Sequence, residues 1–102
     1  LTLALSYGGR QEIIDAFNSI IKKDIKIINE EIIKNHLYCP ELPDPDLIIR
    51  TGGEYRLSNF LLWQSAYSEI YTVKKFWPDF DKNDLENAIN DFKNRDRRFG
   101  KL

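Results

Sequence analysis

The chain has 102 residues, of which 15 are basic and 16 are acidic, and a sequence pI of about 5.8. This length suits one small domain with a modest core, and the balanced charge excludes the positive field that would attract nucleic acid or an anionic membrane surface. No apolar run approaches the roughly 20 residues that cross a bilayer, and the single cysteine excludes an internal disulfide.

The first part of the chain combines an alternating segment with two predicted helices. Residues 1–7 alternate apolar and polar side chains, which predicts a strand already in progress at the first residue. Because the sequence also contains no Met, we expect a fragment of a longer polypeptide. Apolar side chains at helical spacing predict a helix over residues 10–23, and Asn29 is placed to cap a second helix over residues 30–36.

A proline-rich connection leads into the second part of the chain. Residues 40–46 contain three prolines, which favour an extended backbone. The apolar residues 47–50 that follow are short enough for a buried parallel strand, and residues 68–73 predict a further strand.

Two more helices are predicted in this second part. Residues 57–64 predict a short helix capped by Ser58 or Asn59. The last helix begins after Asp81, because Asp84 completes a capping pattern and a stripe of apolar side chains follows. The alternation of strands and helices predicts an α/β fold, a parallel sheet layered with helices. Its three predicted strands need further strands or a partner to cover the sheet edges.

Charged and small residues gather immediately after the first predicted strand of the sheet. Arg50 stands at the C-terminal end of that strand, where open α/β sheets bind their ligands. Gly52 and Gly53 would let backbone N–H groups approach an anion, and Arg56 and Ser58 precede a predicted helix N-terminus. Two guanidinium forks, a hydroxyl and a helix dipole together predict binding of a phosphate or diphosphate.

The residues alone also allow a simpler interpretation of these charges. Arg50 and Arg56 would then be surface residues that form ion pairs with Glu54 and Asp46. Similarly, Glu69 by itself would be an ordinary carboxylate at a strand edge.

A family resemblance covers most of the chain. The segment PDPDLIIRTGGEYRLSNFLLWQSAYSEIY, residues 43–71, followed by WPDF and RRFG, resembles the C-terminal motif region of undecaprenyl diphosphate synthases, which are bacterial cis-prenyltransferases. The opening ALSYGGR is similar to an earlier strand-turn motif of that family, although Ser6 departs from the Asn often found there. The resemblance implies that residues 1–102 are the C-terminal part of a single cis-prenyltransferase domain whose N-terminal half is absent.

The resemblance also implies an activity. Enzymes of this family condense isopentenyl diphosphate with an allylic diphosphate, usually farnesyl diphosphate, with the help of Mg²⁺. The product is undecaprenyl diphosphate, a membrane lipid that carries cell-wall precursors. A homodimer is implied, located in the cytoplasm or peripheral to the inner face of the membrane, and the aromatic residues 63–80 are interpreted as packing at its interface. Because the catalytic Asp would lie in the absent half, this chain alone is expected to be inactive.

Site residues are carried over by position in the matching motifs. The expected substrate-binding residues are Arg50, Glu54, Arg56, Ser58, Arg98 and Gly100. Among them, Glu54 is expected to be a structural and hydrogen-bonding partner of the arginines. Arg98 and Gly100 resemble an element that reaches the isopentenyl diphosphate site of the neighbouring subunit. Glu69 is the expected Mg²⁺ ligand.

Two other functions stay open on the sequence alone. The chain could belong to a non-catalytic partner subunit of such an enzyme, or be an inactive fragment of one, although the intact RTGGEYRLSN motif argues against degeneration. It could also be a generic α/β domain that binds anions, which would need only the glycines and arginines.

Overall fold

The computed structural model describes residues 1–95 and divides the chain into two compact units. The helical unit consists of Leu1–Pro43 and Leu57–Trp63, and the sheet unit consists of Asp44–Arg56 and the described residues from Gln64 onward. Arg98 and Gly100 lie outside the described residues. In the part that is described, no helix has both the length and the apolar character needed to cross a membrane.

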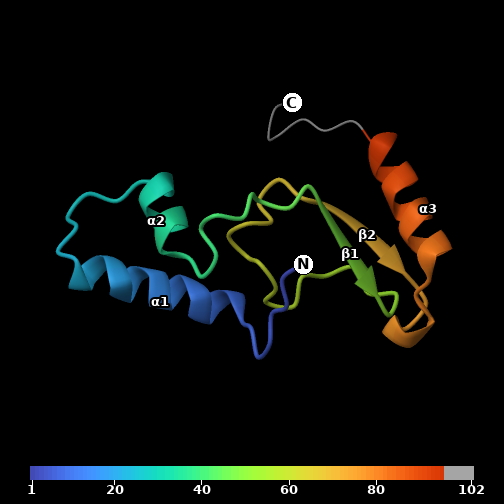
Figure 1. Ribbon diagram of the computed structural model, residues 1–102, viewed down its shortest axis with the longest axis horizontal. Helices are drawn as coiled ribbons and strands as arrows, with labels where there is room; N and C mark the ends of the chain where they lie inside the picture. The colour runs from blue at the N-terminus through green and yellow to red at the C-terminus, as the bar shows by residue number, and fades with distance from the viewer. Residues whose placement is uncertain (96–102) are drawn as a thin grey trace. The chain divides into compact units, whose positions relative to one another are not determined.

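The helical unit is built on two helices that pack side by side, α1 (Gly9–Lys22) and α2 (Glu30–His36) (Figure 1). Both agree with the predicted helices. The side chain of Asn29 accepts a 2.9 Å hydrogen bond from the backbone N–H of Ile32, so it caps α2 as expected. Four buried apolar residues form the core between the helices, and they are Ala16, Ile20, Ile33 and Leu37.

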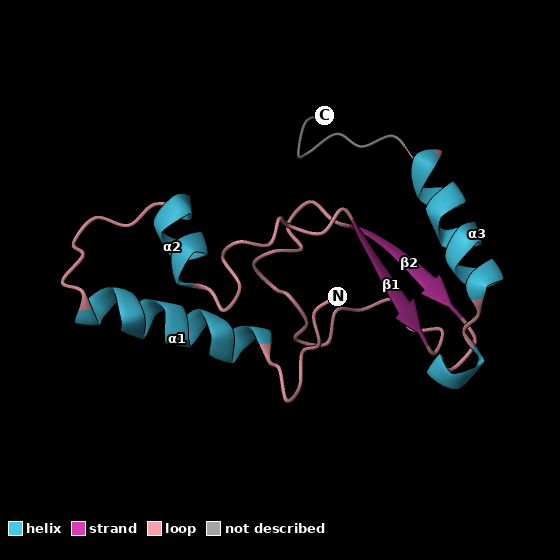
Figure 2. Ribbon diagram, viewed as in Figure 1, coloured by secondary structure: helices cyan, strands magenta, loops and turns pink. Residues whose placement is uncertain are grey.

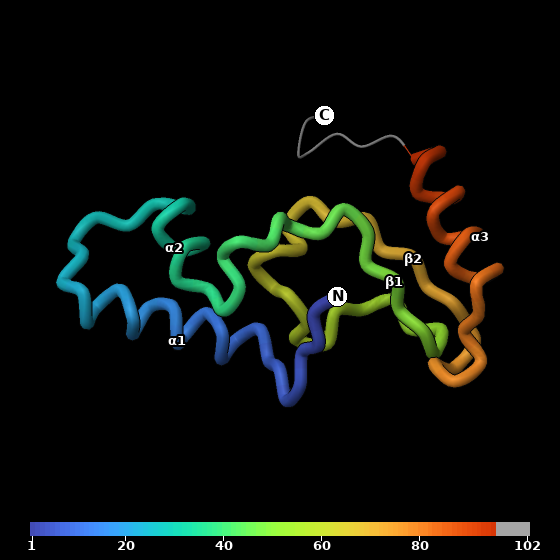
Figure 3. The backbone as a smooth tube through the Cα atoms, viewed as in Figure 1, coloured from blue at the N-terminus to red at the C-terminus, as the bar shows by residue number. Residues whose placement is uncertain are grey.

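The sheet unit contains two parallel strands, β1 (Leu47–Thr51) and β2 (Glu69–Val73), which run side by side in Figure 3. In their register Leu47 lies opposite Glu69, and Arg50 lies opposite Thr72. The short 3-10 helix η1 (Trp77–Asp79) turns the chain into α3 (Lys82–Lys93), which packs against β2. The predicted parallel α/β arrangement is therefore confirmed, but every position of β1 is half-buried rather than buried.

The predicted strand over residues 1–7 is wrong. The segment has no regular secondary structure, and Leu1, Leu3 and Leu5 are largely exposed. A strand needs a neighbour that accepts and donates its backbone hydrogen bonds. Within residues 1–95, β1 and β2 pair only with each other, so the sheet has two strands instead of the three expected.

The predicted helix over residues 57–64 is also wrong. Figure 2 shows a loop there, and the backbone φ angles are +49° at Ser58, +68° at Asn59 and +47° at Leu61. Three left-handed residues within four positions cannot belong to a right-handed helix. Within the described residues no helix therefore begins at Ser58.

Candidate functional site

An ion-paired cluster follows β1 in the sheet unit. One terminal nitrogen of Arg50, Nη2, lies 3.3 Å from Oε2 of Glu54, and Nε of Arg56 lies 3.5 Å from the same oxygen. The other terminal nitrogen of Arg50 donates to the backbone carbonyl of Arg56. Glu54 thus bridges both guanidinium groups, and the hydrogen bond to the carbonyl of Arg56 joins the two ends of the segment from Arg50 to Arg56. We call Arg50, Glu54 and Arg56 the arginine cluster.

The glycine turn inside this cluster does not offer its amides to a ligand, contrary to the prediction. The N–H of Gly52 donates to the carbonyl of Lys75 over 2.9 Å, and the N–H of Gly53 donates to the carbonyl of Val73 over 2.8 Å. Both glycines have positive φ angles, +90° and +75°, which explains the choice of residue. Their amides extend the pairing between β1 and β2 instead of forming an anion nest.

The arginine cluster carries a net charge of +1, because two guanidinium groups face one carboxylate. The side chain of Arg56 is 65% exposed, whereas that of Arg50 is 27% exposed. Shared contact with Glu54 orients both planar groups without neutralising them. The cluster can therefore bind an anion with several oxygens through its guanidinium N–H groups, without the amides of Gly52 and Gly53.

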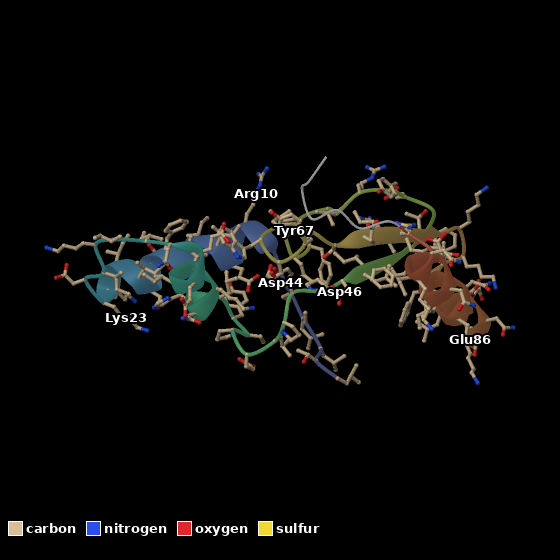
Figure 4. The ribbon with its side chains drawn as sticks, turned by 90° about the horizontal axis from the view of Figure 1, so that it is seen from above. Arg10, Lys23, Asp44, Asp46, Tyr67 and Glu86 are labelled. Atoms are coloured by element: carbon tan, nitrogen blue, oxygen red, sulfur yellow. The ribbon has the colours of Figure 1, made fainter. Side chains whose placement is uncertain are left out.

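Ser58 belongs to the helical unit, where its turn lies against the start of α1. The backbone carbonyl of Asn59 accepts a 2.6 Å hydrogen bond from the N–H of Gly9, and its side-chain Oδ1 accepts a 2.9 Å bond from the N–H of Arg10. Ser58, Asn59, Arg10 and Leu62 line an open pocket of about 350 Å³. Figure 4 shows the side chain of Arg10 extending away from the ribbon near this turn.

Close packing explains the glycine at the start of α1. A Cβ atom on Gly9 would lie 2.8 Å from Cγ of Leu62 and 2.9 Å from the carbonyl of Asn59. Ser58 or Asn59 was expected to cap a helix over residues 57–64, but Asn59 instead accepts hydrogen bonds from the first two residues of α1. The sequence gives no signal for this pairing, because the two segments are far apart along the chain.

Glu12 is a buried carboxylate that the sequence analysis did not single out. Its side chain is 2% exposed, accepts a hydrogen bond from the hydroxyl of Tyr7, and accepts a 3.0 Å bond from the N–H of Tyr38. Burial, together with this hydrogen bond and the nearby charge, raises the pKa of Tyr7. The available signal was its position four residues before Ala16, on the apolar face of α1.

Glu69 begins β2 and is held by an arginine. Nη1 of Arg95 lies 3.0 Å from Oε2 of Glu69 and also donates to the carbonyl of Ile70, while Nε of Arg95 lies 2.7 Å from Oδ2 of Asp91. The hydrogen bond to Glu69 raises the pKa of Arg95. Sequence reasoning did not identify Arg95.

The sheet unit does not place Glu69 beside the arginine cluster. Arg50 lies opposite Thr72, and Glu69 is three residues earlier on β2, about 10 Å along the strand. Within the sheet unit the predicted site residues therefore occupy two places, the arginine cluster and the start of β2, whereas Ser58 belongs to the helical unit.

The donor set at Glu69 fits a contribution to a magnesium site. Mg²⁺ prefers oxygen ligands and is commonly bound by one or two carboxylates together with substrate phosphates and water. Residues 1–95 contain no group of three His, Cys, Asp or Glu residues that could hold a metal ion by themselves. Glu69 can give one carboxylate, and the remaining ligands would have to come from elsewhere.

A comparison with known families identifies the chain's relatives. A family model described as putative undecaprenyl diphosphate synthase matches residues 1–100. The chain belongs to this family. The isoprenyl transferase of Rickettsia typhi is 56% identical over 101 residues, which cover 99% of the chain and 45% of that protein. The isoprenyl transferase of Thermotoga maritima is 57% identical over 107 residues, which cover 100% of the chain and 46% of that protein.

Solved structures of the family share the fold. A probable undecaprenyl diphosphate synthase from Campylobacter jejuni superposes with a TM-score of 0.84 at 45% identity, covering 97% of this chain and 46% of that one. Lavandulyl diphosphate synthase from Lavandula x intermedia, solved with dimethylallyl diphosphate, also gives 0.84, at 38% identity and with 97% and 45% coverage. The cis-prenyltransferase fold is confirmed, and the chain spans slightly less than half the length of these relatives.

Proposed function

We propose that this chain serves in a cis-prenyltransferase that condenses isopentenyl diphosphate with an allylic diphosphate such as farnesyl diphosphate. The product would be undecaprenyl diphosphate, the lipid carrier for cell-wall synthesis. Family membership supports the reaction class, and the arginine cluster supports the substrate class. The single observation that carries the assignment is the pair of guanidinium groups that Glu54 holds together with a net positive charge.

In this proposal the chain binds the isopentenyl diphosphate head group. Arg50 and Arg56 contact the diphosphate oxygens, and Glu54 keeps the two guanidinium planes oriented. Fixing the homoallylic substrate aligns its double bond for attack on the allylic carbon, which lowers the entropic part of the barrier. The groups that ionise the allylic substrate are expected in the part of the enzyme that this chain does not contain.

Glu69 would hold Mg²⁺ as one of several ligands. When bound, the metal would stabilise the negative charge that develops on the departing diphosphate. We further propose a homodimer in which Arg98 and Gly100 act at the neighbouring subunit's isopentenyl diphosphate site. Trp77 and Phe80, which stack with ring centroids 5.7 Å apart, are candidates for the interface because Trp77 is 72% exposed.

Steady-state kinetics of a full-length prenyltransferase that carries this chain would test the proposal. Arg50→Ala should raise the KM for isopentenyl diphosphate roughly 10- to 100-fold, because a charge-assisted contact contributes about 1.5–3 kcal/mol. Arg50→Lys keeps the positive charge but loses the planar guanidinium group that can donate two hydrogen bonds at once. Its KM for isopentenyl diphosphate should therefore lie between those of the parent enzyme and Arg50→Ala. Lys82→Ala removes an exposed cation of α3 and is the matched control.

Two results would reject the assignment. Unchanged KM in Arg50→Ala would show that the arginine cluster does not hold the substrate. Absence of isopentenyl diphosphate incorporation by a correctly folded full-length protein would instead favour a non-catalytic subunit or an anion-binding scaffold.

A further inference from the structure

Arg95 has an unusual position for a residue that follows a surface helix. It stands two residues beyond the end of α3, and its guanidinium reaches back to the first strand position of β2. Three acceptors fix it, namely the carboxylates of Glu69 and Asp91 and the carbonyl of Ile70. The side chains of Arg95 and Glu69 are 31% and 27% exposed, so solvent screens their interaction only partly.

The contact involves one of the two carboxylate oxygens of Glu69. Arg95 donates to Oε2, and within residues 1–95 no hydrogen bond engages Oε1. An arginine side chain stays protonated at any physiological pH, so this positive charge cannot be removed by titration. A cation that binds Oε1 must therefore do so next to a permanent guanidinium charge.

A charge count shows what Arg95 changes. Glu69 and Asp91 contribute two negative charges, and Arg95 reduces their sum to −1. A divalent cation is attracted far less by a net charge of −1 that includes a nearby guanidinium than by a net charge of −2. A bound diphosphate would supply the missing negative charge.

We propose that Arg95 is a positioning residue that acts through Glu69: its guanidinium group is the positive charge that pairs with the Glu69 carboxylate when no metal ion is bound. It weakens divalent-cation binding at Glu69 in the substrate-free protein, so that the cation binds together with a diphosphate. This inference rests on the proposed role of Glu69 as a metal ligand. Arg95 is not among the motif residues named above, and its proposed effect on metal binding is inhibitory.

Binding of Mn²⁺, a spectroscopic substitute for Mg²⁺, tests the inference in the substrate-free protein. Electron paramagnetic resonance of free Mn²⁺ gives the dissociation constant directly. Arg95→Gln removes the charge but keeps an amide that can donate to Ile70, and it should bind Mn²⁺ about tenfold more tightly than the parent protein. Arg95→Ala should behave in the same way, and Arg95→Lys should match the parent protein because it keeps the charge.

Controls separate this inference from the proposed function. Lys93→Gln removes a positive charge from the same helix end and should leave Mn²⁺ binding within about twofold. Glu69→Gln should weaken Mn²⁺ binding in the parent protein and in the Arg95→Gln background. Thermal unfolding followed by circular dichroism checks that each variant is folded, and the two charge-removing variants serve as alternatives if one is unstable.

The outcomes are distinct. If Glu69→Gln weakens Mn²⁺ binding but neither charge-removing variant tightens it, the proposed role of Arg95 is wrong and the metal-ligand role of Glu69 stands. Equal tightening by Arg95→Lys and Arg95→Gln would show that geometry rather than charge is responsible, which also rejects the proposal. If Glu69→Gln has no effect, both the metal-ligand role and this inference are overturned.

Discussion

The carboxylate of Glu12 accepts a hydrogen bond from the backbone N–H of Tyr38, 26 residues further along the chain. The same carboxylate accepts a hydrogen bond from the hydroxyl of Tyr7, a residue that lies just before α1 begins. One buried side chain therefore joins the segment that leads into α1 to the segment that leaves α2. The helical unit depends on this polar contact as well as on its small apolar core.

Glu12→Ala should destabilise the protein by about 2–3 kcal/mol, because it removes two hydrogen bonds and leaves a backbone donor without its partner. Glu12→Gln keeps an acceptor oxygen and should lose less. Urea denaturation measures both values, and Glu41→Ala, an exposed substitution, is the control. Equal stability of Glu12→Ala and the parent protein would show that the buried carboxylate is not important for folding.

Substitutions of Asn59 should reduce the stability of the protein in a defined order, least for Asp, more for Gly and most for Ala. Asn59→Asp keeps the acceptor for the N–H of Arg10 and should be nearly neutral. Asn59→Gly loses the cap but tolerates the +68° φ angle, whereas Asn59→Ala loses the cap and is also strained. We expect losses of about 1 kcal/mol for Gly and about 2 kcal/mol for Ala in chemical denaturation. The reverse order of Gly and Ala would contradict the left-handed backbone at this position.

The phenol of Tyr38 should lose its proton only at a pH well above the usual pKa of tyrosine. Its hydrogen bond to Asp15 raises the pKa of Tyr38 to about 12, and the same bond lowers the pKa of Asp15. A raised folded-state pKa contributes stability below the unfolded value of about 10, and that contribution is lost as pH rises from there through about 12. For Asp15 the sign is opposite, so its contribution is present at neutral pH and disappears as acid protonates the folded carboxylate.

Ultraviolet titration of the phenolate measures this effect, with Tyr38→Phe identifying the relevant transition. Asp15→Asn should lower the pKa of Tyr38 toward its usual value. An unchanged Tyr38 transition in Asp15→Asn would show that the hydrogen bond is not formed in solution.

The start of α3 offers a local test of helix capping. The side chain of Asp81 accepts a 2.9 Å hydrogen bond from the N–H of Asp84, and Asp84 returns a 3.0 Å contact to the N–H of Asp81. Asp81→Ala should therefore reduce stability by about 1 kcal/mol, and Asp81→Asn, which retains an acceptor, should reduce it by less. Thermal unfolding compares the two variants, and equal losses would indicate that charge rather than hydrogen bonding stabilises the helix.

Local signals were sufficient for the elements whose stabilising contacts lie nearby in sequence. Asn29 and Asp81 cap the helices that follow them, because each cap depends on neighbours within a few residues, and the apolar run at Leu47 was a sufficient local signal for a strand. The pairing of β1 with β2 joins residues 22 positions apart, and it could be expected because consecutive parallel strands are joined by a crossover connection of this order of length.

The errors arise where distant contacts decide the structure. Residues 57–64 have an acceptable helical composition, but the carbonyl and side chain of Asn59 bind the start of α1 and require left-handed backbone angles. The amides of Gly52 and Gly53 could not be assigned from sequence, because their acceptors are distant along the chain, at the last residue of β2, Val73, and at Lys75 beyond it. Likewise, no local pattern predicts that Arg95 contacts Glu69.

The occupied amides of Gly52 and Gly53 determine how a ligand at the arginine cluster would respond to its solution environment. Neutral backbone donors depend less on ionic strength than charged side chains do, but the amides of Gly52 and Gly53 are hydrogen-bonded within the sheet unit. With these two amides occupied, the charged side chains of Arg50 and Arg56 provide the donors of the arginine cluster, and that of Arg56 is 65% exposed. The affinity of the arginine cluster for an anion should therefore decline steadily as ionic strength rises. Its selectivity should depend on the charge density of the anion rather than on the anion's shape.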